Sequence, residues 1–444
     1  MKKILIVAEY FAPNNEIGAV RATKLAKHFK LKGYYIGVVS RKMRANESID
    51  TILLKNLKYV DEHIIVSESW LMQKTFWFYN KLRNSNVRKG VTNKTTVKSP
   101  KNNLSNILFS LLRKLFTNSY PFYAAKSYSR KAKKQIGRVC HQYDVVLTSC
   151  SPFSANILGR YAKITNPNIR WIADFRDPLR IDFRLQKHLP YYNWIQNEVI
   201  KRADAITGVS DFCIENFKDG FKGKIIAICN GFDEDDISNI NVVSSEKFSL
   251  TYAGTLYGGK RDLSIVFKAI NELIIESKIN KYNIVINYLG NDVFSFLQQT
   301  DAYDLLDVCK IFGKVDREKS LQLQLNSHIL LLASWNNIGN TGIITGKYLE
   351  YMMINKPIIC SIMGNLPNSV LKEMIIAANN GVVWEQANDE FDYPIMKEYI
   401  LKQYQQYEKG LSLIFAPNRE YINRFRYEEI ANRFIEIIEK DSEN

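Results

Sequence analysis

Short runs of consecutive apolar residues recur along this chain of 444 residues, and segments with helical spacing separate them. Ile4 to Val7 is the first run and Ile36 to Val39 is the second, with a helical pattern over residues 22–29 between them. Apolar runs without alternating polar residues are typical of strands that are buried on both faces of a parallel sheet. The chain is therefore predicted to open with a βαβ unit, which places the fold in the α/β class.

The same rhythm predicts two successive doubly wound α/β domains. A polar stretch from Asp233 to Lys247 is interpreted as the linker between them. The first domain is predicted over residues 1–237 and the second over 245–416, and residues 417–444 are expected to cross back to the first domain as a helix from Tyr421 to Glu439. The further predicted strands cover residues 145–147, 171–173, 205–207, 225–228, 249–253, 284–288, 310–312, 329–332 and 357–360.

Cysteine and histidine are too scattered to build a disulfide framework or a metal centre. The six cysteines form no CxxC pair and the five histidines are isolated, so we expect reduced thiols, a cytoplasmic protein and no metal or other cofactor. The apolar run before Glu9 is shorter than the core of a signal peptide, and no run approaches the roughly 18–20 apolar residues of a membrane span. We therefore expect neither a signal peptide nor a transmembrane segment.

The net charge of +16 is concentrated in one segment, residues 69–143. This segment has sixteen Lys and Arg but no Asp or Glu, so the rest of the chain is formally neutral. Its aromatic residues include Trp70, Trp77 and Phe78. Mixed basic and aromatic residues suit an anionic membrane surface. Nucleic acid is the other polyanion that such a segment can bind, and a solvated insertion loop is the remaining interpretation. We expect a membrane partner and no nucleic acid.

Residues that follow the predicted strands are the candidates for chemistry, because ligands of parallel sheets bind beyond the carboxyl ends of the strands. In the first domain, Gly18 and Arg21 lie in the turn and helix after the first strand. Asp174, Arg176 and Asp177 follow the strand at 171–173, where two carboxylates flank a guanidinium. Such a group is costly to bury unless it is paired or functional, so either a functional site or a structural ion pair is predicted there.

The second domain opens with a strand that runs into a glycine-rich loop with two cations, Lys260 and Arg261. The spacing differs from that of a P-loop, but flexible backbone amides beside Lys and Arg still predict a diphosphate site. Farther along, Lys347 and Glu350 lie three residues apart on a predicted helix, so they share one face of it. A surface ion pair is the alternative interpretation of these two residues.

The ordered set of motifs resembles the GT-B glycosyltransferases, in particular the retaining, family 4-like bacterial enzymes that build surface polysaccharides such as capsule and lipopolysaccharide. The similar stretches are the turn with Gly18 and Arg21, WIADFRDP from Trp171, VS at 209–210, NGFD from Asn230, AGTLYGGK from Ala253 and TGKYLEYMMINKPII from Thr345. The resemblance implies two Rossmann-like domains that face a central cleft. It also implies transfer of a sugar from a nucleotide-sugar donor to a lipid-linked or polysaccharide acceptor, at the inner face of the plasma membrane.

The resemblance also implies roles for individual residues. Lys260 neutralises the donor diphosphate, Lys347 assists it, Glu350 binds the ribose hydroxyls, and Gly18 lets the first loop approach the donor phosphates. The residues implied as catalytic are Asp174, Arg176, Asp177 and Lys260; the donor-binding ones are Gly18, Gly254, Thr255, Lys260, Gly342, Ile343, Lys347 and Glu350; those on the acceptor side are Arg21, Ser210 and Asn230.

One departure from the family pattern concerns Gly342, which stands eight positions before Glu350 where relatives commonly carry a second Glu against the sugar. Sugar identity and stereochemistry are therefore left open. Three alternatives also stay open: a metal-dependent GT-A enzyme using the acidic triplet Asp233 to Asp235, a nucleotide-sugar epimerase on the GT-B scaffold, and a non-catalytic protein that binds membranes or polyanions. We expect the metal-independent glycosyltransferase.

Overall fold

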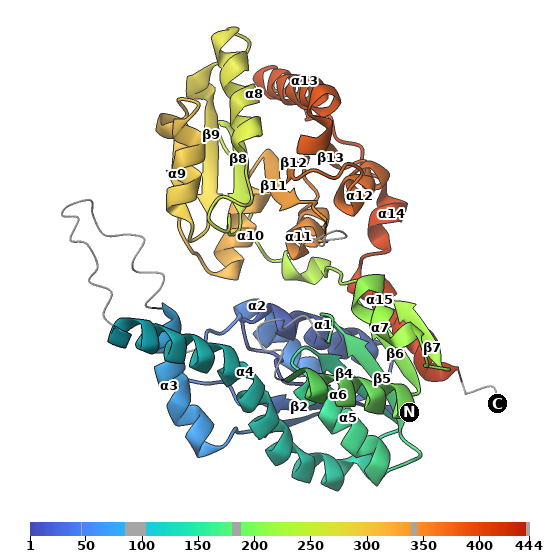
Figure 1. Cartoon of the computed structure of the whole chain (residues 1–444). Helices are drawn as coiled ribbons and strands as arrows, with labels where there is room; N and C mark the ends of the chain where they lie inside the picture. Colours follow the sequence, from blue (N-terminus) through green and yellow to red (C-terminus); the bar gives the residue numbers. More distant parts are fainter. Residues whose placement is uncertain (46, 85–103, 180–187, 339–343, 441–444) are drawn as a thin grey trace. The chain divides into compact units, whose positions relative to one another are not determined.

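The computed structural model describes residues 1–45, 47–84, 104–179, 188–338 and 344–440, as shown in Figure 1. The chain divides into two compact units. Unit 1 comprises Met1–Cys229 together with Ala431–Asn444, and unit 2 comprises Asn230–Ile430. The chain thus leaves the first unit at residue 229 and returns to it at residue 431, whereas the sequence placed these boundaries at 237 and 417.

Unit 1 contains a seven-stranded parallel sheet in the order β3-β2-β1-β4-β5-β6-β7. Its strands are β1 (Lys3–Ala8), β2 (Tyr35–Arg41), β3 (Glu62–Val66), β4 (Val145–Cys150), β5 (Arg170–Phe175), β6 (Ala205–Gly208) and β7 (Lys224–Ala227). The helices are α1 (Ile17–Leu31), α2 (Thr51–Leu54), α3 (Trp70–Asn84), α4 (Leu104–Val139), α5 (Ser154–Thr165), α6 (Leu189–Arg202), α7 (Asp211–Lys218) and most of α15 (Tyr427–Glu439).

Both faces of this sheet are covered, as the unbroken apolar runs predict. Leu5 and Val7 point to one face and belong to a core that α4 and α5 complete. Ile4 and Ile6 point to the opposite face and are also fully buried. Phe29 of α1 and Phe434 of α15 make an edge-to-face ring contact at 6.3 Å, so the last helix packs on α1.

The basic segment 69–143 is largely helical, so its interpretation as a solvated loop is wrong for the residues that the structure describes. It supplies α3 and α4, which lie side by side in Figure 1. The ring of Tyr79 on α3 stacks on that of Tyr120 on α4 at 4.5 Å. Tyr128, Ala132 and Ile136 of α4 are fully buried in the unit 1 core. The segment is therefore the crossover that returns the chain from the edge strand β3 to the central strand β4.

Unit 2 contains a six-stranded parallel sheet in the order β10-β9-β8-β11-β12-β13. Its strands are β8 (Phe248–Ala253), β9 (Ile284–Leu289), β10 (Cys309–Ile311), β11 (Ile329–Trp335), β12 (Ile358–Met363) and β13 (Gly381–Glu385). The helices are α8 (Ser264–Ile275), α9 (Val293–Asp301), α10 (Arg317–Leu325), α11 (Gly346–Ile354), α12 (Val370–Ala378), α13 (Asp389–Glu408) and α14 (Arg419–Asn423). Because β8 and β11 are neighbours, the segments that follow them leave the sheet at the same edge.

The predicted helix from Tyr421 to Glu439 is wrong as a single element, because α14 and α15 are separated at residues 424–426. The break has a clear cause. Phe232 donates its backbone N–H to Phe425 O at 2.9 Å and accepts from Tyr427 N at 2.8 Å, so this stretch pairs with another segment of unit 2. Among the helices that the structure describes, none has both the length and the apolar character needed to cross a bilayer.

Candidate functional site

The glycine-rich loop that follows β8 has a left-handed backbone. Tyr257, Gly258 and Gly259 have φ angles of 53°, 64° and 86°. Glycine adopts such angles without strain, but a tyrosine does so at a cost of about 1–2 kcal/mol. A Cβ atom on Gly258 or Gly259 would meet no heavy atom within 4 Å, so the loop is open on this side. The two glycines therefore serve the backbone conformation rather than close packing.

Three hydrogen bonds fix this loop in place. Asp292, just after β9, accepts from the backbone N–H of Gly258 at 2.6 Å. Thr255 O accepts from the Tyr252 hydroxyl at 3.2 Å and from Arg261 Nη1 at 3.3 Å. Residues from two neighbouring strands and from the loop itself thus determine its shape. Gly254 and Thr255, both predicted to bind the donor, lie in this tethered part.

Lys260 and Arg261 bring two positive charges to the loop. Lys260 is exposed, and its ammonium group has no ion pair with any residue that the structure describes. Arg261 is half-buried, and its Cζ lies 4.8 Å from the centroid of the Tyr257 ring and 5.4 Å from that of Trp335. Trp335 ends β11, so the loop after β8 and the end of β11 meet at this guanidinium.

Helix α11 carries the second half of the predicted donor site. Thr345 precedes the helix as its N-cap, and its Oγ1 accepts from the backbone N–H of Tyr348 at 3.3 Å. Lys347 Nζ and Glu350 Oε1 are 2.7 Å apart, with 32% and 16% of the side chains exposed. The predicted i,i+3 pair therefore forms and is partly buried. Gly342 and Ile343, also predicted to bind the donor, lie outside the described residues.

Positive charges control the ionisation of Glu350. Burial by itself raises the pKa of this carboxyl group, but Lys347 and Arg317 outweigh it and hold the pKa below its ordinary value. Tyr351, the next residue on α11, has a raised pKa, chiefly because it is buried, and the charges of Glu350 and Arg261 both act on it. Tyr351 thus lies close to both halves of the site, the glycine-rich loop and α11.

Arg21 and Asp174, on the first helix and at the end of β5, form a buried ion pair. Arg21 Nε and Nη2 donate to the two carboxylate oxygens of Asp174 at 2.8 and 2.9 Å. The side chains are 1% and 0% exposed. Thr207 of β6 also donates to Asp174 at 2.8 Å, and Arg21 donates to the carbonyls of Ile228 and Cys229 at 2.8 Å each. The pair therefore ties α1 to the ends of three strands.

This burial changes the interpretation of two predicted site residues. The sequence left open a structural ion pair within the group Asp174, Arg176 and Asp177, whereas the structure pairs Asp174 with Arg21. Their mutual bonds occupy the groups assigned to the acceptor and to catalysis. We therefore interpret both as positioning residues. Their contact with a ligand remains a prediction that the structure leaves untested.

Gly18 and Arg176, both predicted from the sequence, are brought together. A Cβ atom on Gly18 would lie 2.5 Å from Nη1 of Arg176, so any other residue there would displace this guanidinium from its place beside the start of α1. Arg176 also donates to the carbonyl of Ser151. Asp177, next to it, is half-buried and makes no ion pair with a described residue. Arg176 and Asp177 follow the carboxyl end of β5, and Gly18 lies in the helix after β1, as predicted from the sequence.

Ser210 and Asn230 complete the predicted acceptor side. Ser210 is the N-cap residue of α7, and its Oγ lies 3.4 Å from Cys213 Sγ. Asn230 is half-buried and is the first residue of unit 2. The structure places Ser210 and Asn230 in different units, so it tests no shared site for them.

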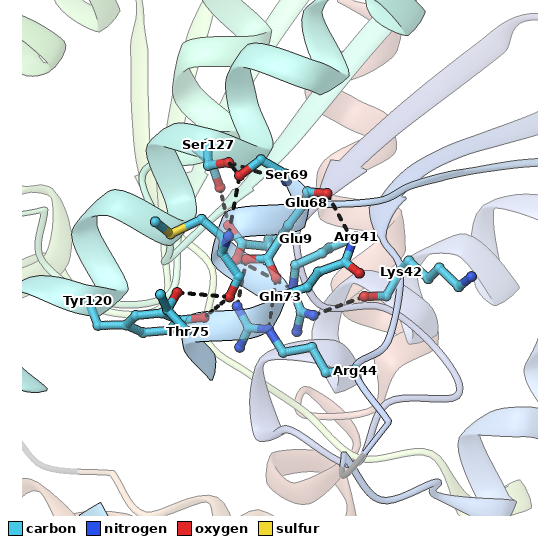
Figure 2. A network of polar contacts seen from close by, with 12 residues as sticks. Glu9, Arg41, Lys42, Arg44, Glu68, Ser69, Gln73, Thr75, Tyr120 and Ser127 are labelled. Atoms are coloured by element: carbon cyan, nitrogen blue, oxygen red, sulfur yellow. Dashed lines mark hydrogen bonds and ion pairs between the residues drawn. The ribbon is translucent and has the colours of Figure 1, made fainter. Parts of the chain in front are cut away.

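A polar network in unit 1, drawn in Figure 2, was missed by the sequence analysis. Arg44, in the loop after β2, donates to both oxygens of Glu68 at 2.8 and 2.6 Å. Its Cζ lies 4.0 Å from the ring centroid of Phe76 on α3. Arg41 pairs with Glu47 at 2.6 Å and lies 3.6 Å from Glu9. No motif predicted this network, since its members are single charged residues after three different strands.

Glu9, just after β1, is a deeply buried carboxyl group of this network, at 4% exposure. It accepts from Ser154 Oγ at 2.5 Å. Burial raises the pKa of Glu9, and Arg41 offsets only part of this effect. In the sequence, Glu9 only marks the end of the first apolar run, and nothing near it signals such a role.

The residues that the structure describes contain no group of three or more His, Cys, Asp or Glu side chains that could hold a metal ion. The acidic triplet Asp233 to Asp235 overlaps a short 3-10 helix, Glu234–Asp236, with Asp233 as its N-cap residue. Glu234 pairs with Arg426, and Asp236 pairs with Arg317 at 2.9 Å. Metal independence stays a prediction, because it concerns the reaction and not this geometry.

Comparison with known proteins identifies the fold and a family match over part of the chain. Residues 97–236 match the model of the family described as Glycosyltransferase Family 4. The solved structures of sucrose-phosphate synthase from Thermosynechococcus elongatus and of the lipopolysaccharide outer core galactosyltransferase WaaB are similar. Both are 13% identical, with TM-scores of 0.54 and 0.51, and the match covers 98% of this chain in each case and 98% and 99% of the other chains. Comparison with curated protein sequences finds no match.

A putative UDP-N-acetylglucosamine 2-epimerase from Listeria monocytogenes is also similar, at 12% identity and a TM-score of 0.50, over 99% of this chain and 96% of that one. At such identities the likeness shows the fold alone, and this fold is shared by transferases and epimerases. The two parallel α/β units therefore define a GT-B protein. The sequence match adds that residues 97–236 resemble a glycosyltransferase family 4 domain.

Proposed function

We propose that this glycosyltransferase takes a sugar from a nucleotide-sugar donor bound to unit 2 and transfers it to an acceptor bound to unit 1. One observation carries the proposal: an open glycine-rich loop with two cations lies at the carboxyl edge of the unit 2 sheet, beside a helix with a carboxylate. Neither cation is neutralised by a carboxylate of a described residue. A diphosphate is an anion that matches this charge.

Within this proposal each donor-site residue has a physical role. Lys260 supplies positive charge to the diphosphate, which stabilises the leaving nucleotide as negative charge develops on it. Glu350 accepts hydrogen bonds from the ribose hydroxyls, for which its lowered pKa keeps it ionised. Lys347 holds Glu350 in place through their 2.7 Å ion pair. The chemistry proceeds with retention, as is typical of this family, and the cations replace a metal ion.

On the acceptor side, Arg176 and Asp177 are the more accessible members of the predicted group Asp174, Arg176 and Asp177. Arg176 lies beside Gly18 at the start of α1. Arg176 and Asp177 are half-buried rather than enclosed, unlike Asp174. We propose that they line the acceptor side near the transferred sugar, with Ser210 and Asn230 farther out, while Asp174 and Arg21 hold the strand ends that position them.

The proposed acceptor is a lipid-linked glycan of capsule or lipopolysaccharide biosynthesis, at the inner face of the plasma membrane. The solvent side of α4 supports this choice. Lys126, Arg130, Lys134 and Arg138 recur every four residues there, opposite the buried side of the helix, over about 18 Å. None of the four forms an ion pair with a described residue. An anionic bilayer matches an unneutralised row of this kind.

The aromatic residues of α3 offer a second element for such a surface. Trp70 and Trp77 are 65% and 66% exposed, and Phe78 is 45% exposed. Indole rings favour the interface between headgroups and acyl chains. The epimerase alternative receives less support than transfer, because the family match is to a glycosyltransferase family.

A screen of nucleotide sugars by thermal shift tests the proposed function, because a ligand that binds only the native state raises its stability. We expect one donor class to raise the midpoint, and Lys260→Ala and Glu350→Ala to weaken its binding about tenfold to a hundredfold while the variants stay folded. Lys268→Ala on α8, a partly exposed lysine outside the proposed site, is the matched control. Unchanged binding in both site variants would remove the basis for the donor site.

Transfer itself is measured with the donor that the screen identifies. Activity is expected to survive EDTA, since cations of the chain neutralise the diphosphate. Full loss of turnover that manganese or magnesium restores would contradict this and would favour the acidic triplet at Asp233.

A further inference from the structure

Helix α3 joins unit 1 through polar and aromatic contacts rather than through the apolar core. Among its residues whose burial the structure describes, 70–79, none is fully buried and none belongs to the unit 1 core. Trp70 and Trp77 are 65% and 66% exposed. An element with few buried apolar contacts is held by only a small share of the global stability, so a ligand that covers it can shift it. Helix α3 is therefore an element whose position a bound bilayer can change.

Arg44, in the loop after β2, holds the start of this helix. Its fork donates to both oxygens of Glu68 at 2.8 and 2.6 Å, and Glu68, just before α3, is 3% exposed (Figure 2). The Cζ of Arg44 lies 4.0 Å from the ring centroid of Phe76 on α3 and 5.8 Å from that of Tyr120 on α4. One guanidinium thus contacts the start of α3, its middle and the neighbouring α4, so a shift of α3 must move Arg44 or break these contacts.

Glu47 extends these contacts to a second loop, the one before α1. Its carboxylate accepts from the backbone N–H of Arg44 at 2.9 Å and from Asn14 Nδ2 at 3.1 Å. Asn14 is 3% exposed, and its Oδ1 accepts at 2.8 Å from the backbone N–H of Glu16, the N-cap residue of α1. The start of α1 is therefore held by a side chain that Glu47 holds in turn.

The loop before α1 leads to the proposed acceptor side. Residues 13–15 pair with residues 48–50 through backbone hydrogen bonds of 2.8 and 3.0 Å, so the two loops move together. Helix α1 follows at Ile17, and Gly18 lies beside Arg176. Polar contacts thus run from α3 to residues that are proposed to line the acceptor side. Packed loops and buried ion pairs have discrete arrangements, so a displacement at one end is passed on rather than absorbed.

We propose that Arg44 is a positioning residue that links lipid contact at α3 to the loop before α1, so that an anionic bilayer holds this loop in place. The inference rests on the proposed function, because it uses the membrane surface and the acceptor side assigned there. When the indole rings of α3 enter the interface, α3 is fixed, and with it the contacts that run from Glu68 through Arg44 to Asn14. The acceptor side is then ordered at the surface where a lipid-linked acceptor lies.

Hydrogen–deuterium exchange of the full chain tests this link, with phosphatidylglycerol vesicles as the anionic probe and phosphatidylcholine vesicles as the neutral one. In the wild type, the anionic vesicles should slow exchange in α3 and also at residues 14–18, by about fivefold or more at that loop, the low end of coupling between linked sites. Arg44→Lys keeps the charge but loses the fork and the flat face on Phe76, so only α3 should still respond. Arg160→Lys, which alters a partly buried pair with Glu198, is the matched control and should respond like the wild type.

A second variant cuts the link at its other end and decides the matter if Arg44→Lys does not fold. Asn14→Asp keeps the acceptor for the Glu16 N–H but replaces the donor to Glu47 with a like charge, so α3 should respond and residues 14–18 should not. Protection of α3 without protection of residues 14–18 in the wild type would overturn the inference and leave membrane binding intact. A full response at that loop in both variants would also overturn it. If neither kind of vesicle binds the wild type, the inference and the proposed membrane surface both fail.

Discussion

The Arg21–Asp174 pair joins residues that are far apart in the chain and removes both from solvent. Each carboxylate oxygen of Asp174 accepts a hydrogen bond from Arg21, and Thr207 adds a third. Arg21 also contacts the ring of Phe434, at 5.3 Å from Cζ to the ring centroid. A buried pair of this kind adds little net stability when intact, but removing one charge leaves the other unpaired. Its function is therefore to position the ends of β5 and β6.

Asp174→Asn is the direct test of this positional role. The substitution keeps the size of the side chain but leaves the Arg21 guanidinium without a counter-charge, so the free energy of unfolding should fall by about 3–5 kcal/mol. Urea denaturation measures it. Asp177→Asn, three residues along and half-buried, is the control and should change stability by less than about 0.5 kcal/mol. A stable Asp174→Asn variant that lost only activity would restore the catalytic assignment.

The polar network of Figure 2 also joins several elements, but at the half of the unit 1 sheet that contains β1, β2 and β3. Its residues come from the loops after β1, β2 and β3, and it reaches α3 and α4 through Phe76 and Tyr120. The Tyr120 hydroxyl donates to Met72 O at 3.0 Å, which holds α4 against α3. The network therefore connects the strand ends of unit 1 to the basic helices.

Glu9 gives this network a pH dependence. Its folded-state pKa is raised, chiefly by burial, so the folded state binds a proton more tightly than the unfolded state does. The stability contributed by Glu9 is thus fully present below the unfolded pKa, near 4.5, and is lost as pH rises through the higher folded value. In Glu9→Gln this loss is absent. Thermal denaturation from pH 4.5 to 8 should show the wild type losing stability relative to the variant as pH rises. A constant difference would contradict the raised pKa.

The sequence predicted most strands but not all, and the reasons are physical. Continuous apolar runs identified β1, β2 and β11, because both faces of a parallel sheet are buried. The strand β3 was missed because it lies at an edge, is half-exposed and begins with Glu62. The strand β13 was missed because it begins with Gly381 and ends with Glu385, which leaves an apolar run of only three residues. The confirmed two-sheet fold follows from the runs that the pattern did identify.

The candidate site was predictable only where it has a local signal. Glycines followed by cations marked the loop at 254–261, and the spacing of Lys347 and Glu350 marked their ion pair. Nothing in the local sequence indicated that Asp174 would be buried against Arg21, because the two residues lie on different elements and meet only in the tertiary structure. The contact of Arg261 with Trp335 also could not be predicted from the sequence, because Trp335 belongs to another strand, β11.

At the scale of the whole molecule, the charge of the chain is divided between the units. The basic segment lies wholly in unit 1, and the open cationic loop lies in unit 2. On α4, the buried side with Tyr128 and Ile136 faces the core while the opposite side carries the row of cations. The same helix thus serves as a crossover of the sheet and presents a charged surface to solvent.

Vesicle co-sedimentation tests whether that surface binds membranes. Each Lys or Arg near an anionic bilayer contributes about 1 kcal/mol, and the attraction decays over a Debye length of about 8 Å at physiological salt. Replacing Lys126, Arg130, Lys134 and Arg138 by Gln should therefore weaken binding to anionic vesicles by on the order of a hundredfold or more. High salt should do the same, and neutral vesicles should bind neither protein.

A control with Lys222, Lys224, Lys247 and Lys409 changed to Gln loses the same charge from exposed positions elsewhere. If that control weakens binding equally, total charge and not the α4 surface is responsible. Binding to neutral vesicles, or to none, would leave α4 as a crossover helix alone.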